Sequence, residues 1–403
     1  MPKLLAMRGN EAVAYAAKYA RVEVVAAYPI TPQTIIVEKI DELISKGEMD
    51  AEMIHVESEH SALAATYGAA AGGVRAFTAT SSHGLMYMYE VLWWTAGSRI
   101  PVVMAVVTRA MGPPWNIHVS HEDILATRDT GWLVSMAENN QEAFDLTLQM
   151  FRITEDPRVY LPGIVGLDGF ILSHTVEPVE LPDQETVDEF LPPRRQPYVM
   201  EPGEPKAMGN LVPDEYFEEL RMDMQQSMEN AVKVIREVGR EYAKYFGRDY
   251  SELVECYKCS DADYIVAGTG SWMGDAKIAA DKLREKGYRV GVMRLRWIRP
   301  FPWSDVREAA MSKKAVIVMD RSLSTGHAGP LFLELSSALE AKPSMIGVPA
   351  GIGGVDISYE DIERFTEKAI QLVEEHGRVY IPAMWYHLGK IFPTYPSSNV
   401  KLD

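Results

Sequence analysis

The feature that most constrains the fold is a repeated alternation between short, β-branched apolar runs and longer stretches of helical character. In the first part of the chain, the runs predict strands at residues 22–28, 53–56, 76–80, 101–107 and 159–165, with another near residue 133. Between them, the pattern predicts helices at residues 10–20, 61–71, 84–96, 120–126 and 141–153. Strands that alternate with helices are typical of βαβ units, so we expect an α/β fold with a parallel sheet that binds ligands beyond the carboxyl ends of its strands.

A second βα series begins at Asp263, after a segment that is rich in proline. Its apolar runs predict strands at residues 264–267, 290–295, 315–319 and 345–348, and helices fit residues 272–286, 303–311, 329–340 and 358–375. Eight of the 24 prolines fall within residues 178–213, which predicts an extended linker or an arm on a surface. We therefore expect a first domain over residues 1–250 that includes this arm, a smaller domain over 260–380 and a C-terminal tail over 381–403.

Composition excludes several classes of protein. Of the 403 residues, 47% are hydrophobic and 24% are charged, which excludes a disordered chain. The formal net charge of −17 argues against binding to nucleic acid. The two cysteines, Cys256 and Cys259, cannot form a four-cysteine iron–sulfur or zinc site. No apolar run approaches the ~20 residues that span a bilayer, so we expect a soluble, cytoplasmic protein.

Four loops that follow predicted strands carry the polar residues that are candidates for catalysis or ligand binding. They are residues 28–32 (YPITP), 57–61 (ESEHS), 78–84 (TATSSHG) and 109–116 (RAMGPPWN). Each also has a structural interpretation. Thr31 is a good helix N-cap, Glu57 and Glu59 suit a helix N-terminus, and Arg109 could pair with Asp123 or Asp129. Together, however, the loops place hydroxyls, a carboxylate and an arginine at one edge of one sheet.

These loops, with residues 128–132 (RDTGW), 138–143 (ENNQEA), 167–174 (LDGFILSH), 190–193 (FLPP) and 290–302, occur in an order that resembles a known family. They are similar to alpha subunits of the 2-oxoacid:ferredoxin oxidoreductase family, which includes pyruvate:ferredoxin oxidoreductase. The resemblance covers nearly the whole chain. It implies a thiamine-diphosphate-binding fold of the pyrimidine type, followed by a smaller α/β domain like the C-terminal domain of transketolase.

The resemblance also implies roles for individual residues. Glu59 matches the glutamate that hydrogen-bonds the aminopyrimidine ring of thiamine, where a carboxyl favours the imino tautomer that accepts the C2 proton. Thr31 and Arg109 match residues that hold the substrate carboxylate and carbonyl. The cofactor-binding positions implied are Tyr28, Pro29, Glu59 and His83.

The residues in two loops bear on the substrate. An oxalate-using relative carries Arg at the position of Thr31 and Asp at the position of Gly112, so this chain favours a monoanionic 2-oxoacid such as pyruvate. Met111, Pro113, Pro114 and Trp115 are expected to line or gate the site and to favour a small side chain. A related 2-oxoacid or oxalate oxidoreductase subunit remains an alternative.

The parts that the chain lacks imply partners. It has no Gly-Asp-Gly motif for the diphosphate and Mg²⁺, and no cysteine cluster for [4Fe-4S] centres. The resemblance therefore implies a hetero-oligomer in which a beta subunit supplies the diphosphate and Mg²⁺ half-site. Gamma and ferredoxin-like delta subunits, ferredoxin as electron acceptor and coenzyme A as acyl acceptor complete the expectation. No metal site is expected in this chain.

Four other interpretations remain open. The chain could be a non-catalytic, regulatory subunit that keeps the fold. Residues 268–274 (GTGSWMG) nearly match a dinucleotide fingerprint and make an NAD-linked dehydrogenase a rival, although packing is the simpler role for these glycines. Cys256 and Cys259 could form a redox pair, and His118 and His121 a metal site, although ordinary thiols and surface or capping histidines are the simpler assignments.

Overall fold

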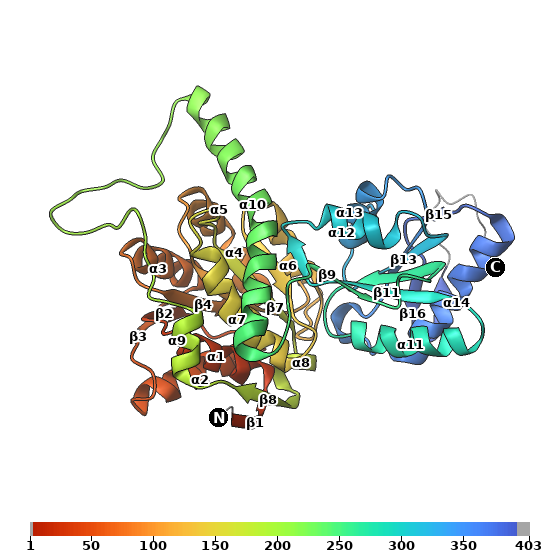
Figure 1. The fold of residues 1–403 in the computed structure, drawn as a ribbon, viewed down its shortest axis with the longest axis horizontal. Coiled ribbons are helices and arrows are strands. Elements are labelled where there is room, and N and C mark those ends of the chain that lie inside the picture. Colours follow the sequence, from red (N-terminus) through yellow and green to blue (C-terminus); the bar gives the residue numbers. More distant parts are fainter. Residues whose placement is uncertain (1–2, 393–403) are drawn as a thin grey trace.

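Two β-sheets lie side by side in the computed structural model, which describes residues 3–392 (Figure 1). The larger sheet has seven strands in the order β12-β6-β7-β5-β4-β2-β3. Six of them come from the first series: β2 (Val24–Ala27), β3 (Glu52–His55), β4 (Ala76–Thr80), β5 (Val103–Thr108), β6 (Leu133–Met136) and β7 (Gly163–Asp168). These six pair in parallel, which confirms the predicted α/β fold with a parallel sheet.

Helices cover this sheet at the predicted places, with local differences. They are α1 (Gly9–Tyr19), α2 (Thr34–Ser45), α3 (Glu59–Ala71), α4 (Ser82–Tyr87), α5 (Tyr89–Gly97), α6 (Glu122–Ala126), α7 (Asn140–Thr154) and α8 (Ile171–His174). The Ser58 and Asn139 side chains cap α3 and α7 by accepting backbone N–H groups. The single helix expected over residues 84–96 is divided into α4 and α5 at Met88.

The smaller sheet has six strands in the order β15-β14-β13-β10-β11-β9. They are β9 (Val254–Tyr257), β10 (Tyr264–Gly268), β11 (Val290–Leu295), β13 (Ala315–Asp320), β14 (Ser344–Pro349) and β15 (Tyr380–Ile381). The helices α11 (Met273–Glu285), α12 (Trp303–Ala310), α13 (Pro330–Ala338) and α14 (Tyr359–His376) agree with the predicted ranges within two residues. The sequence pattern did not predict β9, which pairs antiparallel with β11.

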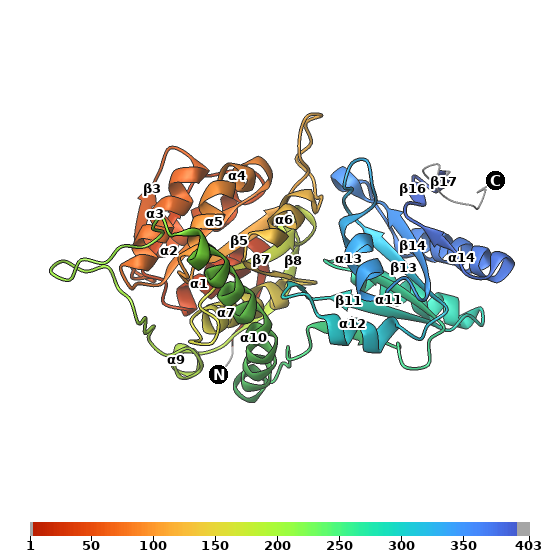
Figure 2. The ribbon, with the colours of Figure 1, turned by 90° about the horizontal axis from the view of Figure 1, so that it is seen from above.

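The proline-rich segment is only partly an arm. Its first part forms β8 (Val176–Leu181), which pairs with β1 (Lys3–Arg8), and α9 (Gln184–Phe190). Residues 191–213 contain no helix or strand and leave the body as a long loop before α10 (Asp214–Phe246) (Figures 1 and 2). The expectation of one extended segment over residues 178–213 is therefore wrong for its first third, because only the later prolines lie close enough together to exclude regular structure.

The expected C-terminal tail also carries structure in its described part. Besides β15, it forms the hairpin of β16 (Trp385–His387) and β17 (Lys390–Phe392).

The two parts of the chain share the larger sheet and a core. The short strand β12 (Trp297–Arg299) lies within the second series in sequence but pairs antiparallel with β6 at the edge of the larger sheet. One apolar cluster runs from Leu92 and Trp132 to Met293 and Phe332, so the core is continuous between the sheets. Among the described residues, no helix combines the length and apolar character required to cross a bilayer.

Candidate functional site

The order of strands in the larger sheet brings the four predicted loops together. Strands β3, β2, β4 and β5 are consecutive neighbours, and one of these loops begins within a few residues of the carboxyl end of each. We call this place the Glu59 edge and define it by Glu59, Thr31, His83 and Arg109. It is where parallel sheets of this kind bind ligands.

Glu59 is the first residue of α3 and is only 9% exposed. Its side chain lies against Gly84, where an added Cβ would come within 2.7 Å of Glu59 Oε1 and 2.6 Å of Thr80 Oγ1. Glycine is therefore required at position 84 for the carboxylate to occupy this place. Within residues 3–392 the buried Thr80 hydroxyl has no hydrogen-bond partner, and Glu59 forms no ion pair. The neighbouring Glu57, by contrast, is exposed and hydrogen-bonds Ser61.

Arg109 follows β5 and is 4% exposed. Its Nη1 donates to the Thr31 carbonyl at 2.6 Å, while the buried Nε has no partner among the described residues. The guanidinium carbon lies 5.5 Å from the centre of the exposed Trp115 ring. Burial lowers the pKa of Arg109, against the attraction of Asp123 and Glu59. The guanidinium keeps donors available beside Glu59.

Two expectations about these residues are corrected. Thr31 is not a helix N-cap, because α2 begins at Thr34 and Gln33 occupies the capping position. Thr31 meets Arg109 through its backbone carbonyl instead. Neither proposed acid pairs with the Arg109 side chain: Asp123 accepts the Arg109 backbone N–H at 3.0 Å, and Asp129 lies 4.0 Å from Arg299.

The remaining predicted positions are exposed. Tyr28, at 39% exposure, and Pro29 follow β2. His83 lies at the start of α4, and its Nε2 is 3.1 Å from the Gly112 carbonyl oxygen and 3.3 Å from the Gly112 nitrogen. His83 therefore ties the loop that carries Trp115 to α4.

Asp123 is a central residue of this edge that the sequence did not indicate as such. Its Oδ2 accepts backbone N–H groups from Ser82 at 2.9 Å and from Arg109 at 3.0 Å. Burial raises the pKa of Asp123 to about 7, against these hydrogen bonds. Asp123 thus joins the loops after β4 and β5. Its place in the first turn of a short helix was the available signal, and that signal does not distinguish it from an ordinary acidic residue.

The other sequence candidates lie elsewhere. His121 is buried and its Nε2 is 2.7 Å from Asp168 Oδ1, so it is not a surface residue. No group of three or more potential ligands that could hold a metal ion occurs among the described residues. Cys256 is exposed and Cys259 is buried, and both are free thiols. Gly270 has φ of +86° and packs against Asp168, which agrees with a packing role.

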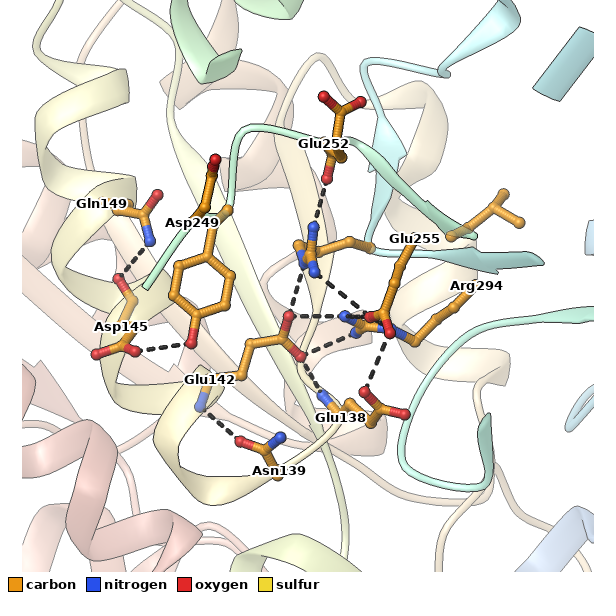
Figure 3. Close-up of polar contacts among 12 residues, drawn as sticks. Glu138, Asn139, Glu142, Asp145, Gln149, Asp249, Glu252, Glu255 and Arg294 are labelled. Atoms are coloured by element: carbon orange, nitrogen blue, oxygen red, sulfur yellow. Dashed lines mark hydrogen bonds and ion pairs between the residues drawn. The ribbon is translucent and has the colours of Figure 1, made fainter. Parts of the chain in front are cut away.

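A second group of charged residues lies between the two sheets and is fully paired (Figure 3). We call it the Glu142 cluster and define it by Glu142, Arg294, Arg296 and Glu255. Arg294 donates to both oxygens of Glu142 at 2.8 Å, and Arg296 Nε donates at 2.6 Å. Burial alone would raise the pKa of Glu142, but the two guanidiniums lower it to about 2. A cavity of about 860 Å³ borders this cluster, yet saturated ion pairs indicate a structural role.

The Glu59 edge fits one half of a thiamine site. The carboxylate of Glu59 forms no ion pair with a described residue, Gly84 leaves room beside it, and the buried Thr80 hydroxyl has no partner among those residues. These features suit a flat heterocycle with hydrogen-bond donors and acceptors along its edge. Arg109 suits a carboxylate beside it, because a guanidinium binds carboxylates in planar geometry.

Comparisons with known proteins show the family of the chain. Residues 15–240 match the family described as "Pyruvate flavodoxin/ferredoxin oxidoreductase, thiamine diP-bdg", and residues 262–362 match "Pyruvate:ferredoxin oxidoreductase core domain II". The chain is 48% identical to the ketoisovalerate oxidoreductase subunit VorA of Pyrococcus abyssi over 94% of this chain and 96% of that one. It is 45% identical to the pyruvate synthase subunit PorA of Pyrococcus furiosus over 96% and 98% of the two chains.

A solved structure shares the fold. The 2-oxoglutarate:ferredoxin oxidoreductase of Magnetococcus marinus superposes with a TM-score of 0.70 at 21% identity. The match covers 91% of this chain and 65% of that longer chain. A split-gene transketolase matches with a TM-score of 0.52 at 12% identity, over 91% of this chain and 99% of that one. The thiamine-diphosphate-binding fold expected from the sequence is thereby confirmed.

Proposed function

The chain belongs to the pyruvate flavodoxin/ferredoxin oxidoreductase family, and we propose that it is the alpha-type subunit of a cytoplasmic 2-oxoacid:ferredoxin oxidoreductase. The reaction converts a small 2-oxoacid and coenzyme A into an acyl-CoA and CO₂ and passes two electrons to ferredoxin. Pyruvate is the proposed substrate. The observation that carries this proposal is the Glu59 edge, where a carboxylate without an ion pair lies beside a buried arginine with available donors.

We assign the roles of the residues from this arrangement. Glu59 hydrogen-bonds the pyrimidine ring and holds a proton there, with Gly84 leaving room for the carboxylate. Arg109 binds the substrate carboxylate, and the Thr31 carbonyl fixes the guanidinium in place. Tyr28, Pro29 and His83 border the cofactor. Bound thiamine diphosphate supplies the electron sink for decarboxylation.

The partners follow from what this chain does not contain. The relatives from Pyrococcus are themselves named as subunits. We propose that a beta subunit holds the diphosphate and Mg²⁺ against the Glu59 edge. We further propose that gamma and delta subunits supply the acyl-transfer and [4Fe-4S] functions, with ferredoxin as the final acceptor.

A second candidate substrate is a branched-chain 2-oxoacid. The identity to ketoisovalerate oxidoreductase subunits, 48% for that of Pyrococcus abyssi, is slightly higher than the 45% to the pyruvate synthase subunit of Pyrococcus furiosus. Comparing kcat/KM for pyruvate and for ketoisovalerate with the purified complex decides between them, and a ratio above about ten in either direction is decisive.

The test of the catalytic assignment uses the chain co-purified with its partners in a dye-reduction assay that depends on 2-oxoacid and coenzyme A. We expect Glu59→Gln to lower kcat by roughly 10²- to 10⁴-fold, because the amide cannot hold the proton. Glu57→Gln is the matched control, two residues away and exposed, and it should keep activity. Full activity in Glu59→Gln would contradict the proposal.

A further inference from the structure

A small cavity between the carboxyl edges of the two sheets holds charges that the proposed reaction does not use. Its volume is about 230 Å³. We call it the Arg321 pocket, and the residues used in the argument are Arg321, Asp275, Asp356, Ser271, Trp272 and His118, all of which line it. Arg321 follows β13, Asp275 lies in the first turn of α11, and His118 belongs to the loop after β5.

Arg321 is buried, and its side chain has no hydrogen-bonding partner among residues 3–392. It is 3% exposed, its guanidinium stacks 4.4 Å from the Trp272 ring, and its Nε has no partner within the part of the chain that the structure describes. Burial lowers the pKa of Arg321, against the attraction of Asp168, Asp275 and Asp356. Burying a guanidinium without an acceptor lowers the stability of the folded state, and an acceptor that binds to it offsets this cost in free energy.

The buried carboxylate of Asp168 makes its hydrogen bonds to other residues. Asp168 Oδ1 is 2.7 Å from His121 Nε2, and Asp168 Oδ2 accepts from the Ser271 hydroxyl at 2.6 Å and the Ser271 backbone at 3.0 Å. The charge of Arg321 helps to lower the pKa of Asp168, but no hydrogen bond joins the two side chains. The Arg321 guanidinium can therefore donate to an acceptor that enters the pocket.

The same pocket holds two acids. Asp275 is half-buried and Asp356 is exposed, and neither forms a salt bridge with a described residue. Asp275, Asp356 and Arg321 line one cavity. Burial and the charge of Asp356 raise the pKa of Asp275, and the charge of Arg321 lowers it. Among the described residues, this cavity thus presents a guanidinium whose Nε has no hydrogen-bonding partner and two carboxylates without a salt bridge.

We propose that the Arg321 pocket binds a small α-amino acid, with its carboxylate on Arg321 and its ammonium group between Asp275 and Asp356. A zwitterion satisfies both kinds of unpaired charge, whereas a simple anion would meet the two carboxylates and a simple cation would meet the arginine. The volume of the pocket accommodates a ligand of the size of alanine.

Titration calorimetry of the chain co-purified with its partners tests this site, with three probes: L-alanine, propionate and ethylamine. We expect saturable binding of L-alanine, and binding at least roughly 10-fold weaker for propionate and ethylamine, because each loses one charged contact. No saturable heat with L-alanine would overturn the site. Propionate that binds as tightly as L-alanine would overturn the role of the acids.

Variants separate this pocket from the Glu59 edge. Arg321→Gln, and independently Asp275→Asn with Asp356→Asn, should weaken alanine binding roughly 10- to 100-fold. If Arg321→Gln does not fold, the aspartate variants and Arg321→Lys still report on the site. Arg289→Gln, at an exposed arginine paired with Asp263, is the matched control. Arg109→Gln should leave the affinity for L-alanine unchanged. If Arg109→Gln abolishes the binding heat, L-alanine binds at the Glu59 edge and the proposal is overturned.

Discussion

The Glu142 cluster and the Glu59 edge both bury charged side chains, but only in the cluster do these side chains have partners of opposite charge among the described residues. In the cluster, Glu142 receives three charge-assisted hydrogen bonds from Arg294 and Arg296 (Figure 3). At the edge, Glu59 forms no ion pair with a described residue, and Arg109 Nε has no partner there. Saturated charges stabilise a fold, whereas buried groups left without partners indicate where a ligand binds. A cavity of about 860 Å³ lies beside the saturated cluster, where the charged groups already have partners.

The strongest way to break this comparison is to remove Glu142. Glu142→Ala leaves two buried guanidiniums without their shared carboxylate, and we expect the free energy of unfolding to fall by about 3–5 kcal/mol. Urea denaturation measures it. The control Glu48→Ala removes an exposed ion pair with Lys18 and should change the free energy of unfolding far less. Equal changes in the free energy of unfolding for the two variants would contradict a structural role of the cluster.

Arg109→Gln tests the opposite side of the comparison. The change removes a charged donor from the substrate carboxylate, and we expect KM for the 2-oxoacid to rise roughly 10- to 100-fold. The free energy of unfolding should change by about 1 kcal/mol or less, because the side chain has one hydrogen bond to the protein. Steady-state kinetics and urea denaturation report the two quantities. A large loss of stability with unchanged KM would make Arg109 structural.

The pH dependence of stability sharpens the difference between Glu142 and Asp123. The pKa of Asp123 is about 7 in the folded chain against an ordinary value of 3.8, so between these values only the folded state holds the proton. Its contribution to stability is therefore present at low pH and declines as pH rises from about 4 to 7, by up to roughly 1.4 kcal/mol per unit. Urea denaturation of the wild type and of Asp123→Asn at several pH values measures the difference, which should fall over this window and then level off. A constant difference would contradict the raised pKa.

Trp115→Ala gives the smallest expected effect. The ring lies over Arg109 at an exposed position, where a cation–π contact contributes about 0.5–1 kcal/mol. We expect a two- to fivefold change in KM for the 2-oxoacid. Trp303→Ala, at an exposed tryptophan in edge-to-face contact with Phe301, is the matched control and should leave KM unchanged. Identical KM values in the two variants would exclude Trp115 from the site.

Local sequence patterns predicted most of the fold because its strands are short apolar runs that alternate with longer stretches of helical character. They did not predict β12 in the larger sheet, nor the pairing of Glu142 with Arg294, because both depend on contacts between residues far apart in sequence. Thr31 shows a different failure. A threonine before proline is a good N-cap by propensity, but Gln33 takes that position. Glu59 and Arg109 were proposed from their loops and a family resemblance, whereas the role of Asp123 required the backbone geometry of two loops.

The strand β12 has a consequence for how the chain is made. The seventh strand of the larger sheet is supplied by Trp297–Arg299, so the ribosome must deliver the beginning of the second series before the first sheet is complete. A nascent chain that ends at residue 250 exposes β6 as an open edge with unpaired N–H and C=O groups, the kind of edge that recruits other strands. The last strand to arrive closes that edge, and it commits the two halves of the polypeptide to fold as neighbours.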